Sequence, residues 1–372
     1  MNKKNIKKFL LFILLIFFVF CFAFVVSRKK QEIINLYTYN IVYKLNYNNK
    51  IKNTNTIEDS IGKNKKLGNF YLNLKDERGR TQATHPKVLR FQKKWNGYRY
   101  WIAYTPYPYG NAIKENPCVM ASNDLVKWNI ISKKNIPLDK PLGKATKKRY
   151  NSDTHLVYIN DTDTLELYWR YVDDIKGTVT IYKMTTKDGI KWSNKEIVLK
   201  DNRKKNDYLS PAIIYENGKY MMWYINQNIK LQYTEYDTNK KIWTTPREIK
   251  IDYKNKKLKT WHIDVIKNEN HYEAIMVAYE DWNNRKNMKL FYSHSYDNYN
   301  WTSAKEILNS KKGGLYRSSI LHFNHTYYIL YSEISKRGKR GIGIAYGTDI
   351  NDLNGLNTKN INKFRKYINL NG

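Results

Sequence analysis

The chain has few of the residues that mark several common kinds of protein. It contains two cysteines among 372 residues, Cys21 and Cys118, so disulfide bonds cannot staple its globular part. It has no glycine-rich phosphate loop, no helix-turn-helix pattern and no Cys/His set with zinc-ligand spacing. No long amphipathic helical pattern follows residue 60. These absences argue against nucleic-acid binding and for an all-β fold whose stability comes from its core.

Acidic residues are also scarce. The chain has 33 of them against 66 Lys and Arg, a formal net charge of +33. A basic surface attracts anionic polymers, including those of a cell wall. However, the lysines are spread evenly along the chain. Asn, Ile, Lys and Tyr are all unusually frequent, as is typical of proteins encoded by an AT-rich genome. Both interpretations of the charge stay open, and neither indicates a nucleic-acid partner.

Aromatic residues are abundant, with 33 Tyr and 10 Trp, and they belong to a pattern that recurs five times. Each copy begins with a polar cluster that leads into an apolar strand, followed by a turn and an aromatic strand. The apolar strands begin near Val88, Leu156, Ile213, Val265 and Ile320, at spacings of 68, 57, 52 and 55 residues. Repeats of this length that hold several strands are typical of propeller blades. The sequence therefore predicts an all-β, five-bladed propeller.

The polar residue that opens each copy is the candidate functional position. In a propeller the innermost strand of every blade lines the central channel, so residues from different blades converge there. The residues at this position are His85, Asp153, Ser210, His262 with Asp264 on the same strand face, and Arg317. The alternative is that they only cap strands, but five caps would more often be Ser, Thr or Asn. We therefore expect one polar site at the channel mouth, where a structural cation could also be held.

The N-terminal part of the chain predicts a membrane anchor. Phe9 to Val26 is an apolar run of 18 residues with cations on both sides, long enough to span a bilayer core of about 30 Å. A cleaved signal peptide is the alternative, but its apolar core would be shorter and followed by small residues. We predict a cytoplasmic end at 1–8, a signal anchor at 9–26, a stalk at 27–69, the propeller at 70–356 and a polar tail at 357–372.

The stretches Thr84–Leu89, Trp95–Pro108 and Glu115–Asp124 resemble bacterial proteins related to the five-bladed glycoside hydrolase clan. That clan includes the arabinanases and β-xylosidases of glycoside hydrolase family 43 and the fructosidases. The resemblance covers roughly residues 70–350 and implies three acids at the channel mouth, one from each of the first three blades. One would be the base that activates water, one would tune the pKa and orient the sugar, and one would be the protonated acid. Glycoside hydrolysis requires such groups.

The match to those three acids is partial. Asp153 corresponds to the second-blade acid, whereas His85 and Ser210 stand where the clan usually has Asp and Glu. Glu115 and Asp207 are the available substitutes for the partner acid, and His85 could serve as a base. The predicted catalytic residues are thus Asp153, Glu115, Asp207 and His85. The predicted substrate-binding residues are Ser210, His262, Asp264, Arg317 and Trp261.

Two further patterns bear on the site. Four copies close on an Asp and a Trp, similar to the Asp-box of sialidase-type propellers, and we assign these residues to folding: Asp124, Asp188, Asp237 and Asp297 with Trp128, Trp192, Trp243 and Trp301. Aromatic residues at the mouth could stack on sugar rings. The candidates are Tyr107, Tyr109, Trp169, Trp223, Trp261 and Trp282.

These observations predict a monomeric protein of the cell membrane whose propeller lies outside the cytoplasm. The predicted partner is a polysaccharide or oligosaccharide, and the predicted activity is that of a glycosidase. The alternative is a glycan-binding or polysaccharide-assembly protein that kept the fold and lost the acids. The missing blade-one Asp and blade-three Glu favour the alternative, and the polar residue on every blade favours the enzyme.

Overall fold

The structure is a computed structural model that describes residues 67–141, 146–237, 239–254, 257–281, 283, 287–310 and 312–371. The predicted membrane anchor at 9–26, with nearly all of the stalk, lies outside these residues. Among the described residues no helix is long and apolar enough to cross a membrane. The propeller occupies the compact unit that begins at Lys65.

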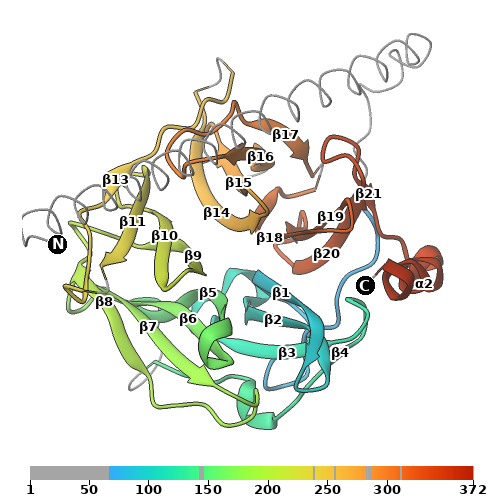
Figure 1. Ribbon diagram of the computed structural model, residues 1–372, viewed down its shortest axis with the longest axis horizontal. Coiled ribbons are helices and arrows are strands. Elements are labelled where there is room, and N and C mark those ends of the chain that lie inside the picture. The colour runs from blue at the N-terminus through green and yellow to red at the C-terminus, as the bar shows by residue number, and fades with distance from the viewer. Residues whose placement is uncertain are drawn as a thin grey trace, which may run out of the picture. The chain divides into compact units, whose positions relative to one another are not determined.

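The described strands form five antiparallel sheets arranged around a centre, and the predicted five-bladed propeller is confirmed (Figure 1). In each sheet the first strand in the sequence is innermost and the later strands follow outward, and β13 pairs with β11 beside β12. The strands of the first two blades are β1 (Ala83–Trp95), β2 (Tyr98–Pro106), β3 (Cys118–Ser122), β4 (Trp128–Asn129), β5 (Arg149–Ile159), β6 (Thr164–Asp173), β7 (Thr178–Thr186) and β8 (Glu196–Asn202). Those of the third are β9 (Leu209–Glu216), β10 (Lys219–Ile225), β11 (Leu231–Asp237), β12 (Ile242–Trp243) and β13 (Arg247–Glu248). Those of the last two are β14 (Lys259–Asn268), β15 (His271–Tyr279), β16 (Lys289–Ser295), β17 (Lys305–Leu308), β18 (Leu315–Phe323), β19 (Thr326–Ile334), β20 (Arg340–Gly347) and β21 (Asn354–Gly355).

The inner strands share an irregularity that sets up the site. The pairing of each inner strand with the second strand of its blade shifts register near the residue that opens the repeat. Such a bulge leaves residues outside the regular ladder and re-aims a side chain. At the bulges of the first three blades, His85, Asp153 and Ser210 have φ angles of 52°, 50° and 55°. The same local distortion therefore places one polar residue per blade at the top of the channel.

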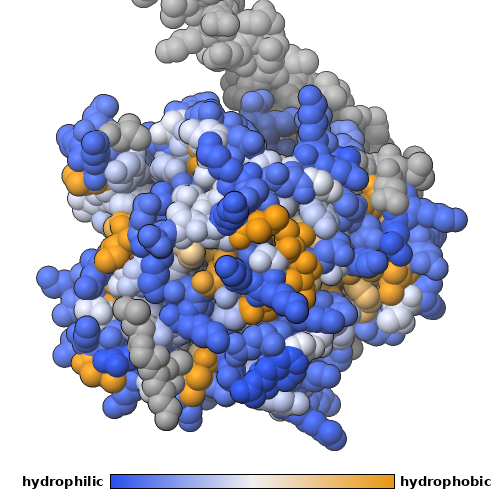
Figure 2. Space-filling model, turned by 90° about the horizontal axis from the view of Figure 1, so that it is seen from below, coloured by the Kyte–Doolittle hydropathy of each residue, from blue (hydrophilic) through white to orange (hydrophobic). Residues whose placement is uncertain are grey.

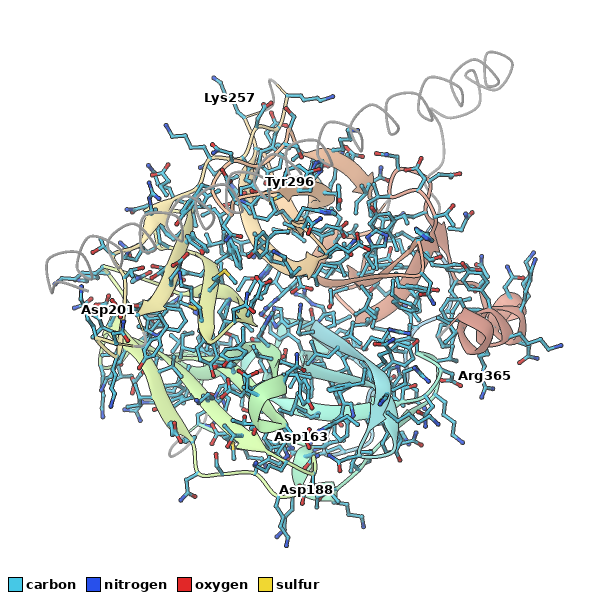
Figure 3. All side chains as sticks on the ribbon, viewed as in Figure 1. Asp163, Asp188, Asp201, Lys257, Tyr296 and Arg365 are labelled. Atoms are coloured by element: carbon cyan, nitrogen blue, oxygen red, sulfur yellow. The ribbon has the colours of Figure 1, made fainter. Side chains whose placement is uncertain are left out.

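The closing Asp residues are structural, as predicted. Asp124, Asp188, Asp237 and Asp297 each accept hydrogen bonds from the backbone N–H groups two and three residues later. These bonds satisfy a tight turn between the outer strands. Figure 3 shows Asp188 at the outer edge of its blade, far from the centre.

The two ends of the propeller meet at the fifth blade. The segment before β1 runs along blade five, where Phe70 and Leu72 donate backbone hydrogen bonds to Leu356 and Ile342. The predicted polar tail at 357–372 is wrong for most of its length, because α2 (Ile361–Asn371) is a helix. Phe364 and Ile368 are buried in the core cluster that joins blades one and five, and they hold this helix on the protein.

The face of the molecule in Figure 2 is mainly polar. On this face, hydrophobic residues form separate patches among hydrophilic ones. The large apolar side chains instead fill clusters between neighbouring blades, with Trp101, Trp169 and Trp223 fully buried. The predicted stacking of Trp169 and Trp223 on sugar rings is therefore wrong, because these side chains pack inside the protein. Trp282 lies outside the described residues.

A buried carboxylate between blades four and five predicts a pH-dependent stability. Burial alone would raise the pKa of Glu273, but hydrogen bonds from His271 and His322 outweigh it and lower the pKa to about 2. A lowered folded-state pKa stabilises the protein above the ordinary carboxyl pKa, and this stability is lost as the pH falls toward 2. We expect Glu273→Gln to lower the free energy of unfolding by about 2–3 kcal/mol at pH 7. Urea unfolding from pH 7 to pH 3 should show this difference shrinking.

The matched control for that measurement is Glu248→Gln, since Glu248 is exposed and paired only with Lys230 at the surface. It should change the free energy of unfolding by less than about 0.5 kcal/mol at every pH. A difference between wild type and Glu273→Gln that stays constant with pH would contradict the assignment.

Candidate functional site

The residues that open the repeats do converge at the top of the channel. His85 Nε2 lies 3.7 Å from Asp153 Oδ1, and His262 Nδ1 lies 3.6 Å from the same oxygen. Arg317 Nη1 approaches that oxygen to 3.6 Å. Each of these four residues is at most 1 % exposed. Four blades therefore supply one compact, buried polar cluster around a single carboxylate oxygen.

Glu115 joins this cluster from the loop between β2 and β3. Its Oε1 lies 2.9 Å from His85 Nδ1, and Thr105 Oγ1 lies 2.9 Å from the same nitrogen. Burial, and next the charge of Asp153, raise the pKa of Glu115 well above its usual range. Glu115 and Asp153 thus face the two nitrogens of one imidazole ring, and burial favours the protonated form of Glu115.

The two histidines of the cluster are neutral. Burial lowers the pKa of both His85 and His262 well below the usual value, and the nearby charge of Arg317 acts in the same direction. A neutral imidazole has one nitrogen free to accept a proton or to bind a metal ion. The site is therefore suited to proton transfer among Glu115, His85 and Asp153.

The same atoms form a donor set for a metal ion. One ligand atom each from His85, Asp153 and His262 lies within 4.8 Å of the others. His85 Nε2, Asp153 Oδ1 and His262 Nδ1 are buried and have no hydrogen-bond partner among the described residues. Buried polar atoms without partners cost about 1–3 kcal/mol each unless a ligand satisfies them. Two imidazoles and one carboxylate are the ligands of many divalent transition-metal sites, so this donor set fits such an ion. A bound ion would polarise a substrate oxygen or activate a water molecule.

This fit predicts that a divalent cation stabilises the protein. At about 100 times its Kd, a cation bound by His262 should raise the Tm by about 5 °C. Thermal unfolding of metal-stripped protein with added Mn²⁺, Zn²⁺ or Ca²⁺ measures this shift. His262→Gln should abolish the shift, and His325→Gln, which alters an exposed histidine in the β18–β19 turn, should keep it. If none of the three cations raises the Tm of the wild type, the cluster does not hold a divalent ion.

A second ring lies two residues further along the inner strands. Lys87 Nζ donates to Asp264 Oδ1 at 2.7 Å, and Ser319 Oγ donates to Asp264 Oδ2 at 3.0 Å. His155 joins this ring, with its Nδ1 4.0 Å from Asp264 Oδ1. Asp264 was predicted to bind substrate, but protein groups already occupy both its oxygens. The structure instead places Asp264 in a buried network that ties blades one, four and five together.

Asp207 also supports the site from outside it. Its carboxylate pairs with Arg170 and, at 2.9 Å, with Nε of Arg203. Arg170 Nη1 in turn donates to Ser152 Oγ, whose hydroxyl donates to Asp153 Oδ2. The prediction of Asp207 as partner acid is corrected accordingly, because two guanidinium groups hold its carboxylate away from the cluster. Of the two candidate acids, Glu115 is the one beside His85.

The remaining predicted substrate residues have protein partners as well. Ser210 Oγ lies 3.2 Å from the carbonyl oxygen and 3.1 Å from the nitrogen of Ile263, so it joins blades three and four. Arg317 Nη2 donates to the carbonyl of Pro211 at 2.7 Å, while Nε and Nη1 have no hydrogen-bond partner among the described residues. Trp261 packs edge-on against His262 and Tyr279. Contact between these residues and substrate stays a prediction.

The aromatic layer above the cluster includes residues that the repeat does not single out. The ring of Tyr316 lies 5.2 Å from that of His85 and 4.3 Å from that of His262, and Tyr107 stacks on His85 at 6.2 Å. Arg340, at the start of β20, lies over both tyrosines. No sequence signal indicated Arg340, because it lies on a third strand and outside the repeated motif.

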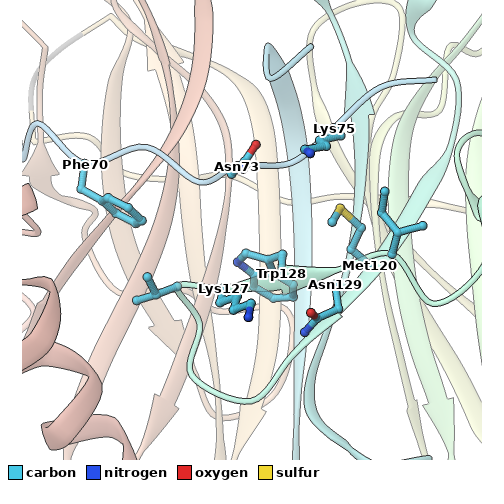
Figure 4. Close-up of a pocket in the computed structure, with 9 residues that line it drawn as sticks. Phe70, Asn73, Lys75, Met120, Lys127, Trp128 and Asn129 are labelled. Carbon is cyan, nitrogen blue, oxygen red and sulfur yellow. The ribbon is translucent and has the colours of Figure 1, made fainter. Parts of the chain in front are cut away.

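A groove of about 490 Å³ is found elsewhere, between the segment before β1 and the outer strands of blade one. Figure 4 shows Phe70, Asn73 and Lys75 on one side of it and Met120, Trp128 and Asn129 on the other. None of the cluster residues lines this groove. The chemistry-bearing side chains therefore lie at the channel and not in this groove.

Comparison with known proteins is consistent with this architecture. No family model matches the chain. It is 28 % identical over 227 residues to the A type blood N-acetyl-α-D-galactosamine deacetylase of Flavonifractor plautii, a match that covers 50 % of this chain and 29 % of that protein. The chain thus spans less than a third of that relative's length.

Solved structures share the fold. An N-acetylgalactosamine deacetylase from F. plautii, in complex with blood group B trisaccharide, superposes with a TM-score of 0.64 at 22 % identity, over 76 % of this chain and 95 % of that one. An exo-1,5-α-L-arabinanase from a bovine ruminal metagenomic library gives 0.51 at 15 % identity, over 71 % and 93 %. A xylan β-1,4-xylosidase from Bacillus halodurans C-125 gives 0.55 at 13 %, over 76 % and 54 %. The chain has the five-bladed propeller fold seen in family 43 glycoside hydrolases and in this deacetylase.

Proposed function

We propose that the chain is a hydrolase of carbohydrates that removes the acetyl group from an N-acetylated amino sugar. The observation that carries the proposal is the array of Glu115, His85 and Asp153, in which a protonated acid, a neutral imidazole and a second carboxyl group meet. The F. plautii relative, named as an N-acetylgalactosamine deacetylase, supports this choice of reaction.

The array supplies what amide hydrolysis needs. Water attacks the acetyl carbon while Nε2 of the neutral His85 imidazole accepts one of its protons, and Asp153 beside that nitrogen stabilises the imidazolium that forms. The bond from carbon to nitrogen then breaks, and Glu115 donates its proton to the departing amine. The products are acetate and a free amino sugar. Arg317, whose Nη1 lies 3.6 Å from Asp153, would keep that carboxylate in place through the cycle.

Hydrolysis of a glycosidic bond is the second candidate. Two carboxyl groups near one site are the feature that favours it, together with the fold. The third-blade acid of that reaction is missing, however, since Ser210 stands there and is bound to the backbone of Ile263. The geometry therefore supports deacetylation better.

One experiment separates these reactions from glycan binding without catalysis. The purified full chain is incubated with a panel of N-acetylated oligosaccharides, and ¹H NMR follows both free acetate and the anomeric signals. Acetate without new reducing ends is the expected result. New reducing ends without acetate would establish the glycosidase instead. If a bound oligosaccharide stays unchanged, the protein is a glycan-binding propeller and the proposal fails.

We also propose that the protein is a monomer of the cell membrane and acts outside the cytoplasm. The apolar run Phe9–Val26 with its flanking cations supports an anchor. Fractionation of cells, followed by protease treatment of intact cells, tests this. We expect the protease to digest the propeller on intact cells. A propeller that stays intact under this treatment would contradict an external location.

A further inference from the structure

Arg340 is a buried cation directly above the catalytic cluster. It is the first residue of β20 in blade five and is 8 % exposed. Its guanidinium carbon lies 4.6 Å from the ring centre of Tyr107 and 4.8 Å from that of Tyr316. These two rings lie against His85, so Arg340 forms the next layer outward from the site. A cation over two aromatic faces is held firmly without using up its hydrogen-bond donors.

Within the part of the chain that the structure describes, no carboxylate forms an ion pair with Arg340. Its Nε and Nη1 are buried and make no hydrogen bond within the described residues. Glu115 lies against His85 and Asp153 lies beside Arg317, so neither carboxyl group is paired with Arg340. The other buried cations near the channel are paired, Lys87 with Asp264 and Arg170 with Asp207. Arg340 is therefore a buried cation with unsatisfied donors, which an anionic ligand would satisfy.

The backbone of an exposed aromatic residue is linked to the backbone of Arg340. The side-chain oxygen Oε1 of Gln82 accepts hydrogen bonds from the backbone nitrogens of both Tyr109 and Arg340, each at 3.2 Å. Tyr109 is 66 % exposed and has a left-handed backbone, with φ 53° and ψ 27°. Gln82 thus ties the backbone of Tyr109 to that of Arg340, at the junction of blades one and five. An exposed aromatic residue near a buried cation suits a sugar ring that carries a negative group.

We propose that Arg340 and Tyr109 form a subsite for an anionic sugar next to the one that is deacetylated. The inference rests on the proposed function, and it names the substrate class as glycans with a carboxylate or phosphate on the neighbouring residue. Arg340 binds the oxyanion, and Tyr109 stacks on the ring. Arg317, to which the sequence analysis gave the role of holding substrate, lies one layer deeper and faces Asp153.

The test compares three N-acetylated oligosaccharides that differ only in the neighbouring sugar. One carries a uronic acid, one carries a phosphate, and one is the carboxyl-reduced neutral form. Acetate release gives kcat and KM, and calorimetry gives Kd. For the wild type we expect KM and Kd at least 10-fold lower for one of the anionic oligosaccharides than for the neutral one. Which anion is preferred distinguishes a uronate from a phosphate.

Variants then assign the preference to its residues. Arg340→Gln should raise KM for the anionic oligosaccharide about 10-fold and leave KM for the neutral oligosaccharide within 2-fold. Arg340→Lys should raise KM for the anionic oligosaccharide by a smaller factor. Arg337→Gln makes the same change of charge at an exposed turn of the same blade and should change neither. Tyr109→Ala, at an exposed position that should not disturb folding, should raise KM for all three oligosaccharides alike.

Equal binding of charged and neutral oligosaccharides by the wild type would overturn the subsite. An equal loss on both in Arg340→Gln would overturn it too, because the residue would then be structural. The calorimetric measurement of Kd does not depend on catalysis. If no acetate is released but the anionic oligosaccharide still binds through Arg340, the proposed reaction fails and the subsite stands.

Discussion

Replacing Asp153 by Asn should lower kcat for acetate release by about 1,000-fold, because the imidazole of His85 then loses the carboxylate that favours its protonated form. The side chain keeps its size, and its one amide oxygen can still accept from Ser152, which donates to the carboxylate in the wild type. Binding of substrate should therefore change by less than about 3-fold. Glu115→Gln removes the proton donor and should reduce kcat by a similar factor. Steady-state kinetics with an N-acetylated oligosaccharide measures both effects.

The control for these variants is Asp163→Asn. Asp163 is a carboxylate in the β5–β6 turn of blade two, where Trp95 and Tyr158 donate to it. Figure 3 shows Asp163 away from the centre of the ring. Its replacement should leave kcat within 2-fold of wild type. If Asp153→Asn retained more than a tenth of the wild-type kcat, the site would lie elsewhere.

Lys87→Met should lower the free energy of unfolding by about 3–5 kcal/mol. Lys87 is 3 % exposed and its amino group reaches Asp264 Oδ1 at 2.7 Å, so its loss leaves a charge buried without its partner. Burial lowers the pKa of Lys87, and the charge of Asp264 opposes that shift. Urea unfolding should show the decrease as a lower midpoint with an unchanged slope.

Two further variants separate this effect from a simple packing defect. Lys87→Met combined with Asp264→Asn should recover about 1–2 kcal/mol, since the uncompensated charge is then gone. Lys140→Met removes an exposed lysine that pairs with Glu77 and should cost less than about 0.5 kcal/mol. If the double variant were no more stable than Lys87→Met, the loss would come from packing and not from the unpaired charge.

The repeat predicted the part of the site that depends on blade geometry. His85, Asp153, His262 and Arg317 meet at one oxygen because each opens the inner strand of its blade. The repeat could also have predicted the second ring of the channel. Its residues each follow an opening residue by two positions: Lys87, His155, Asp264 and Ser319. That offset puts side chains on the same face of a strand. Only Asp264 was predicted for the site, and its partners were missed.

Other features depend on contacts that no local pattern encodes. Arg340 reaches the mouth from the start of a third strand, through packing between blades one and five. Ser210 and Asp207 stand where polar residues suggested chemistry, yet interblade contacts engage them. The helix α2 was missed because two apolar residues, Phe364 and Ile368, hold its 11 residues on the core. Tertiary packing decided each of these cases.

The most direct test of the account is a ¹H NMR time course of a purified N-acetylated oligosaccharide with the wild type and with Asp153→Asn. The central claim is that the cluster around Asp153 hydrolyses an amide on a sugar. We expect a growing acetate singlet with the wild type, with glycosidic signals unchanged, and acetate release slowed about 1,000-fold with Asp153→Asn. Equal acetate release by both proteins, or an oligosaccharide that the wild type binds and leaves intact, would contradict it.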